Sequence, residues 1–306
     1  MTDHLQWLGK GVRVAQHLHC DPSTVSRKVE SCCQFYGVKT VRQLGEWQVV
    51  GDRRLMHHER QLHQQLRLHS YAPLRLSLPA QVGRVLAPAV PIIWDAVEDN
   101  LLGIQRPLQL LQDRVIDAWL CTTGEELGSW HQGEYRMMPL AELKLDLLTH
   151  QERGPASLED LRQNPEASVL MGQPALLPRR DHWVAGMGLL STLIDGQRYE
   201  ASQWERPVNK GLAVVPGTAL DRCVRAEWRP LKGVTPLLTS VCVVTLHDLS
   251  ESTAVQQLVE ACSHRIRQVL QSSATPEDVR SQRPTRGTGQ EAATTPKMHW
   301  QKLQAM

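Results

Sequence analysis

The chain has 306 residues, of which 41% are hydrophobic, and it carries 34 Lys and Arg against 32 Asp and Glu. This composition is ordinary for a globular protein with two or three compact units, and it excludes a low-complexity or strongly charged chain. No run of about eighteen apolar residues occurs, and the start of the chain has no charged-then-apolar signal segment. We therefore expect a cytoplasmic protein with no membrane span.

The near-neutral total hides an uneven distribution of charge. Residues 1–70 carry ten Lys and Arg against six Asp and Glu, whereas residues 71–270 carry nineteen against twenty-three. A basic head on an acidic body suits a polyanion-binding module joined to a domain with another task. The seven cysteines are an odd number without paired C-x-x-C spacing, so we expect buried, reduced thiols.

The first fifty residues predict a small helical unit. Residues 2–9 form a short helix with inward Leu5 and Leu8, and a second helix follows with an apolar stripe at Val14, Ala15 and Leu18. A third helix begins after Asp21, a good N-cap residue, with Pro22 at the first helical position. It buries apolar residues on one side and ends where a glycine is available to close it. The residues concerned are Val25, Val29, Cys32, Cys33 and Gly37.

The outward side of this third helix carries short hydroxyls and two cations in its first turns. Such residues at a helix N-terminus suit phosphates and base edges in a DNA major groove. The pattern predicts a helix-turn-helix, although a capped, amphipathic surface helix would give the same local pattern. The candidate DNA-binding residues are Ser23, Thr24, Ser26, Arg27 and Lys28.

Leu18 to Val29, followed by Gly37-Val38, resembles the DNA-binding signature of LysR-type transcriptional regulators, a bacterial family. The family's recognition helix carries a Ser-Arg-containing run that Thr24-Val25-Ser26-Arg27-Lys28-Val29 matches. In the resemblance, Val38 to Val50 around Gly45 is the β-hairpin wing, from which Lys39 and Arg42 could reach phosphate. The resemblance thus implies double-stranded DNA as a partner.

The segment from Asp52 to His69 predicts one uninterrupted helix that Asp52 caps. Leu55, Leu62 and Leu66 form a stripe too narrow for a globular core but suited to pairing with another helix. In the family this is the linker helix through which subunits dimerise, so the resemblance implies a homodimer or homotetramer. The histidines on this helix have poor chelating spacing, and we predict no metal site.

Tyr71-Ala-Pro73 breaks the helix and marks a domain boundary. Strands and helices then alternate, which predicts a parallel sheet with helices on both faces. The expected strands are 74–78, 100–104 and 115–121, and the expected helices are 82–94 and 107–114.

Later segments resemble the family's effector-binding domain. Leu110 to Leu120 resembles its signature of a helix end and a following strand, and 139–148, 157–161 and 211–216 have counterparts further on. In 157–161, Ser157 stands three residues before Asp160, a capped helix start. A strand at 241–246 and a closing helix at 252–270 complete the pattern, and the resemblance covers about 10–270.

The predicted fold class is therefore α/β: an N-terminal all-α winged helix-turn-helix, a linker helix, and a two-lobed α/β effector-binding domain of the periplasmic-binding-protein type. The expected boundaries are 1–51 for the DNA-binding domain, 52–70 for the linker helix, and 72–270 for the effector-binding domain. Its lobes are 72–148 with 247–270, and 149–246. The remaining residues, 271–306, are rich in Ser, Thr, Pro, Gln and Gly and are expected to be disordered.

In an open parallel sheet, ligands bind at the carboxyl ends of strands, where helix N-termini offer free N–H groups. Polar residues at these positions favour a small effector that carries a carboxylate or phosphate. In the resemblance the first position, commonly Ser or Thr, is Gln81. The candidate effector-binding residues are Gln81, Gln105, Thr122 and Thr123.

Catalytic signatures are missing from the sequence: none of the common phosphate-loop, nucleophile-elbow, zinc-protease or dinucleotide motifs occurs. The adjacent polar residues at 180–182 and 247–248 are interpreted as surface clusters. We predict no enzyme, no catalytic residue and no cofactor. Two alternatives stay open: a solute-binding or enzymatic α/β protein whose N-terminal helices serve assembly, and a degenerate family member that acts through a partner regulator.

Overall fold

The computed structural model describes residues 1–128 and 133–273, and the elements below belong to a compact unit that spans Met1–Ser272. Of the predicted disordered tail, 271–306, all but the first three residues lie outside the described residues. Those three continue the last helix, α12 (Thr253–Ser273), which runs slightly beyond the predicted end at 270.

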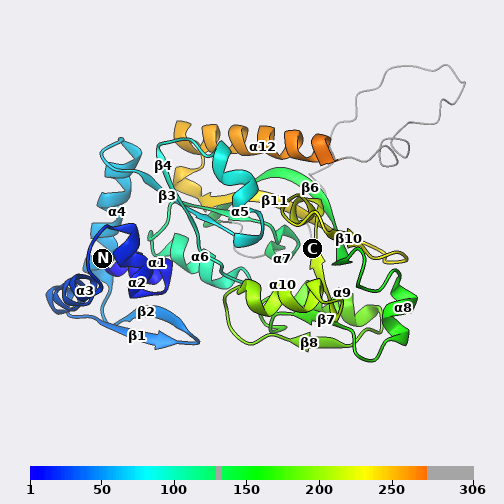
Figure 1. Cartoon of the computed structure of the whole chain (residues 1–306). Helices are drawn as coiled ribbons and strands as arrows, with labels where there is room; N and C mark the ends of the chain where they lie inside the picture. The colour runs from blue at the N-terminus through cyan, green and yellow to red at the C-terminus, as the bar shows by residue number, and fades with distance from the viewer. Residues whose placement is uncertain (129–132, 274–306) are drawn as a thin grey trace, which may run out of the picture. The chain divides into compact units, whose positions relative to one another are not determined.

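The N-terminal elements are three helices and a hairpin, as the sequence predicts (Figure 1). Leu5, Leu8 and Val14 are buried where these helices meet, because each helix turns its apolar stripe inward. Gly37 closes the third helix with φ 64°, a backbone conformation that favours glycine. The elements are α1 (Thr2–Leu8), α2 (Gly11–His17), α3 (Pro22–Tyr36), β1 (Lys39–Gln43) and β2 (Glu46–Val50).

Helix α4 (Arg54–Leu68) is the predicted linker helix, and it begins two residues later than expected. Arg53 is its N-cap residue, and Asp52 contributes from outside by accepting a hydrogen bond from the Arg54 N–H at 3.1 Å. The opposite sides of α4 differ in chemistry, since three of its four buried residues are polar. These three are Arg60, Gln64 and Arg67, and the fourth is Met56.

One mixed sheet runs through the rest of the described chain, in the order β4-β3-β5-β11-β6-β9-β7-β8, with β10 paired to β6. Strands β3, β4 and β5 are parallel to one another, and so are β7, β8 and β9, whereas β11 is antiparallel to both β5 and β6. The prediction of a parallel sheet is therefore correct within each half and wrong where β6 and β11 join the halves. The first-half strands and the joining pair are β3 (Leu74–Leu78), β4 (Trp94–Glu98), β5 (Ala118–Cys121), β6 (Tyr135–His150) and β11 (Leu237–Leu246).

The predicted elements between residues 80 and 121 need correction. The expected helix 82–94 ends early, because Pro88 and Pro91 cannot continue it: α5 spans Ala80–Leu86 and a 3-10 turn spans Ala87–Ala89. The second strand lies before the predicted 100–104, and the third is shorter than 115–121. Helix α6 (Gln105–Gln112) replaces the expected 107–114.

The second half alternates strands with short helices, and its capped start at Ser157 is confirmed: Ser157 and Asp160 form a reciprocal capping box. The expected strand at 241–246 is present with longer bounds, and the segments 139–148 and 211–216, which resemble parts of the family's effector-binding domain, also lie largely in strands. The elements are α7 (Gly124–Leu127), α8 (Leu158–Gln163), β7 (Ser168–Met171), α9 (Pro178–Gly186), β8 (Ser191–Leu193), α10 (Ala201–Asn209), β9 (Ala213–Gly217), α11 (Ala219–Val224), β10 (Trp228–Pro230) and a 3-10 turn at His247–Leu249.

Alternating residues of the first-half strands enter two different cores, as the two-residue period of a strand requires. Leu120 and Val243 pack on one face with side chains of α5 and α12. Trp119 and Val244 pack on the other face with side chains of α6, and this core also contains Leu5 and Trp7 of α1 and other side chains from α2 and α3. The helix-turn-helix thus shares a hydrophobic core with the first half of the sheet.

Candidate functional site

Helix α3 presents the five residues predicted to contact DNA. Val25 and Val29 point inward, with 2% and 7% of their surface exposed. The polar residues before and between them therefore face outward from the first two turns of the helix. Ser26 is exposed, and its hydroxyl bonds back to the Pro22 carbonyl at 3.3 Å. The exposed Arg27 lies 3.5 Å from the Thr24 hydroxyl. The side chains available to a partner are Ser23, Thr24, Ser26, Arg27 and Lys28.

The hairpin predicted as the wing places its two cations at opposite ends of β1. Lys39 begins the strand and lines a groove of about 880 Å³ between α3 and the hairpin, together with Ser26. Arg42 lies toward the turn, where its Nε donates to the Gly45 carbonyl at 3.1 Å. Lys39 and α3 therefore border one groove, whereas Arg42 is farther along the hairpin.

The predicted dimerisation stripe lies on the outside of α4. Leu55, Leu62 and Leu66 have 59%, 60% and 40% of their surface exposed. Leucines at such exposure on one helix are costly in water and favour burial against another surface. The stripe fits the predicted role, while the polar side of the helix faces the rest of the chain.

A small cavity lies at the carboxyl end of β5, where the sequence predicts the effector site. Thr122 and Thr123 both line it, with Arg180 and Asp221 from the second half of the chain. Gln105 does not line it; it is the exposed first residue of α6. Gln81 belongs to α5, and its side chain lies outside what the structure describes. The structure therefore brings two of the four predicted residues together.

Two buried carboxylates beside this cavity connect the two halves of the chain. Arg180 donates to Glu125 at 2.5 Å and to the Thr122 carbonyl at 3.1 Å. Glu126 accepts hydrogen bonds from the backbone N–H groups of Arg179 and Arg180, at the start of α9. A helix N-terminus attracts negative charge, and here a carboxylate of the same chain occupies it. The interpretation of Arg180 as a surface residue is wrong, since its side chain is only 12% exposed.

A second, more apolar cavity adjoins the first, and Arg180 and Asp221 line both. Arg225 enters it from the end of α11, 4.9 Å over the Trp228 ring. Its Nη2 donates to Glu205 at 2.6 Å, while its buried Nε and Nη1 have no hydrogen-bond partner among the described residues. Burial raises the pKa of Asp221 above its ordinary value, against the hydrogen bonds from Thr218.

Sequence reasoning missed Arg225 and Asp221 as pocket residues. Residues 219–224 form one short helix, and nothing in its local pattern indicates that Asp221 lines a cavity together with Thr122. Arg180 could have been noticed, because it belongs to the polar run at 180–182.

Neither a metal site nor a membrane span is found in the part of the chain that the structure describes. In the ranges 1–128 and 133–273, no group of three or more His, Cys, Asp or Glu side chains could hold a metal ion. Within those same ranges, no helix combines the length and apolar character that crossing a membrane requires.

The fold is like that of LysR-type regulators in its order of elements: a helix-turn-helix, a β-hairpin, the long helix α4 and an α/β region built on one mixed sheet. The structure is similar to that of a Corynebacterium glutamicum OxyR C206 mutant, with a TM-score of 0.50 over 89% of this chain and 92% of that one, at 14% identity. It is also similar to CbnR, a LysR family transcriptional regulator, with a TM-score of 0.48, 13% identity and coverage of 86% and 96%. A third is Vibrio fischeri DarR in complex with DNA, with a TM-score of 0.46, 10% identity and coverage of 86% and 96%. Comparison with protein-family models and with curated proteins gives no match.

Proposed function

We propose that this chain is a DNA-binding transcriptional regulator whose DNA binding changes when a small ligand occupies the pocket beside Thr122. The observation that carries the proposal is the first part of α3, where exposed hydroxyls and two exposed cations face outward beside a wing. A recognition helix contacts base edges with its N-terminal residues, and flanking cations bind phosphate. The cytoplasm, where such DNA is found, is the proposed location.

The proposal assigns sequence reading to Arg27. An arginine that bonds a guanine edge is worth roughly 1–3 kcal/mol of discrimination, so Arg27→Ala should weaken binding by that amount and blur one position of the selected site. The measurement is selection of binding sites from random duplexes, followed by anisotropy titration at one fixed salt concentration. The matched control is Arg206→Ala, which removes an exposed arginine from α10, away from α3. Identical selected sites and affinities for the wild type and Arg27→Ala would refute the assignment.

The proposed ligand is a small anion with an apolar body. Thr122 and Thr123 offer hydroxyls, and Arg180 and Arg225 offer positive charge in the two adjoining cavities. The buried Nε and Nη1 of Arg225 have no hydrogen-bond partner among the described residues, and a carboxylate oxygen could accept from them. The apolar walls, which include Trp204 and Trp228, suit the rest of such a molecule.

The proposed assembly is a homodimer, or a tetramer made of two dimers, that uses the leucine stripe of α4. Two copies of α3 would then contact two half-sites about one helical turn of DNA apart. A ligand changes the balance between two arrangements only by binding one of them more tightly.

A further inference from the structure

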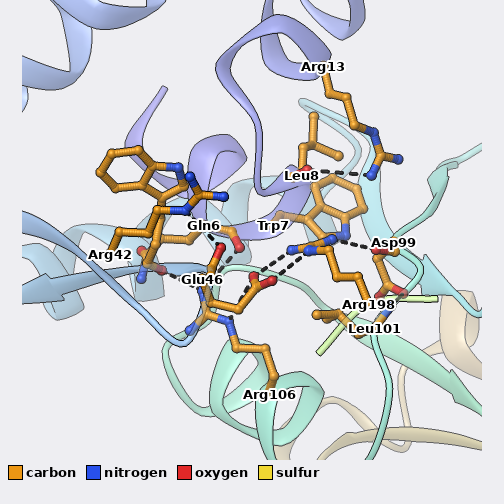
Figure 2. Close-up of polar contacts among 12 residues, drawn as sticks. Gln6, Trp7, Leu8, Arg13, Arg42, Glu46, Asp99, Leu101, Arg106 and Arg198 are labelled. Carbon is orange, nitrogen blue, oxygen red and sulfur yellow. Dashed lines mark hydrogen bonds and ion pairs between the residues drawn. The ribbon is translucent and has the colours of Figure 1, made fainter. Parts of the chain in front are cut away.

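Glu46, the first residue of β2, is buried with 2% of its surface exposed, although it lies next to the exposed turn of the hairpin at Leu44 and Gly45. Arg198, from the loop after β8, holds it with two hydrogen bonds: Nε donates to Oε1 and Nη2 to Oε2, both at 2.6 Å. Arg106, on α6, lies 3.9 Å from the same carboxylate. Figure 2 shows the carboxylate of Glu46 directed toward both guanidinium groups. The wing is thus attached to both halves of the effector-binding region.

The surroundings fit this attachment closely. Arg106 also donates to the backbone carbonyls of Gln6 and Trp47, so it fixes the wing and α1 together. Gly9, which ends α1 with φ 73°, lies against the Arg198 guanidinium. A side-chain carbon at Gly9 would come within 2.6 Å of that group, so a larger residue would displace Arg198.

Arg198 is also connected directly to the ligand pocket. It forms an isolated antiparallel bridge with Leu101, and the Leu102 N–H donates to the Gln197 carbonyl at 2.8 Å. On its other side, the Tyr199 N–H donates to the Asn100 carbonyl at 2.6 Å. Leu101 and Leu102 line the first cavity, and Leu102 and Tyr199 line the second. A ligand that moves any of these pocket residues therefore moves the backbone of Arg198.

We propose that Arg198 is a positioning residue that links the wing to the pocket, so that pocket occupancy changes how firmly Glu46 holds the wing. This inference rests on the proposed function only for its consequence, a change in DNA binding. The link itself needs no DNA. A paired buried charge resists separation, because breaking the pair leaves a carboxylate without a partner in a dry environment. In this proposal the wing has two states, held and released, as coupling between two sites requires.

The first experiment measures hydrogen exchange of the wing amides between residues 39 and 50 in the full chain. Arg198→Met and Glu46→Gln should each speed this exchange by about tenfold or more, since each removes hydrogen bonds to a charged group. The double variant should exchange no faster than the faster single variant. Arg206→Met is the control and should leave wing exchange unchanged. Unchanged exchange in the single variants, or multiplied effects in the double variant, would overturn the assigned pair.

The second experiment tests the connection to the pocket with a side chain that mimics occupancy. Gly172 lines the apolar cavity, and a side-chain carbon there would meet Leu102 at 3.9 Å, an ordinary contact. Gly172→Leu, or the smaller Gly172→Val if the leucine variant does not fold, should change wing exchange by about threefold or more. In the Arg198→Met background the same substitution should have no effect on the wing. An equal effect in both backgrounds, or none in the intact chain, contradicts the link.

DNA titrations of the same variants separate the two proposals. Should the wild type bind no duplex while the exchange results hold, the link stands and the proposed function fails. Should the wild type bind DNA while wing exchange is insensitive to both Arg198 and Gly172, the proposed function stands and the link is wrong.

Discussion

Replacing Asp117 by Asn would remove the charge that holds α4 to the sheet, with very little change in side-chain shape. Asp117, just before β5, is fully buried and accepts four hydrogen bonds. Arg67 donates two of them, at 2.7 and 2.8 Å, and Gln64 donates one at 2.8 Å, so α4 supplies three of the four. The Arg75 backbone N–H donates the last at 2.8 Å. Because Arg67 is itself only 6% exposed, solvent can do little to stabilise its charge once the carboxylate is gone.

The expected cost follows from removing one partner of a buried ion pair. Such a change costs about 3–5 kcal/mol, since it leaves an uncompensated charge in the interior. The asparagine amide would also direct its own N–H groups at donors that it cannot satisfy. We therefore expect Asp117→Asn to lower the free energy of unfolding by about that amount. The assay is urea denaturation followed by the fluorescence of the nine tryptophans.

The matched control is Asp113→Asn. Asp113 accepts from Arg53 at 3.4 Å, and the Arg53 side chain is 45% exposed. An ion pair that water reaches contributes less than about 1 kcal/mol, so this variant should unfold close to the wild-type urea concentration. A loss below about 1 kcal/mol for Asp117→Asn, or equal losses for the two variants, would refute the assignment of Asp117 as the anchor of α4.

Three further outcomes follow. Leu62→Glu should dissociate the proposed dimer in sedimentation experiments, because an unpaired carboxylate is costly to bury; an unaltered assembly would show that the interface lies elsewhere. Thr122→Val should weaken the binding of a hydrogen-bonded anion by about 1 kcal/mol or more, as measured by calorimetric titration of metabolite pools. Equal affinity for wild type and variant, or no anion bound by the wild type, would show that no anion binds beside Thr122. Asp99→Asn should flatten part of the stability profile: burial raises the pKa of Asp99 to about 6 from 3.8, so the folded chain holds this proton more firmly. The stability it contributes is present below about pH 4 and is lost, by about 3 kcal/mol, as pH rises to about 6. Denaturation at several pH values should therefore show that the unfolding free energy of the wild type falls more steeply between about pH 4 and 6 than that of the variant. Parallel dependences on pH would contradict this reasoning.

The sequence predicted best those elements whose ends are determined locally. Helix α3 has a proline at its first position and Gly37 at its end, and both signals act within a few residues. The capping box at Ser157 is equally local. The predicted helix 82–94 was wrong, because its apolar residues fit a helix while two prolines within it end the helix early. Strand β4, which then begins at Trp94, is specified by pairing with β3 rather than by its own pattern.

The candidate site residues also fall into those that local sequence can predict and those that it cannot. Thr122 and Thr123 were predicted because a residue after a parallel strand lies at the ligand-binding edge whatever the rest of the fold does. Glu46 and Arg198 are 152 positions apart, and no local pattern can pair them. Arg225 lines the apolar cavity beside Tyr199, to whose hydroxyl it donates although 26 positions separate the two residues, and no local pattern pairs them either.

The central claim, that α3 and the wing bind DNA, is tested most directly by the salt dependence of binding to a duplex from upstream of the chain's own gene. Anisotropy titrations at several salt concentrations give the slope of log affinity against log salt. A protein that places Lys28, Arg27 and Lys39 on phosphate or base edges releases counterions, so affinity should fall steeply with salt, and Lys28→Ala should reduce the slope by about 1. No association at low salt, or binding with no slope, would contradict the claim.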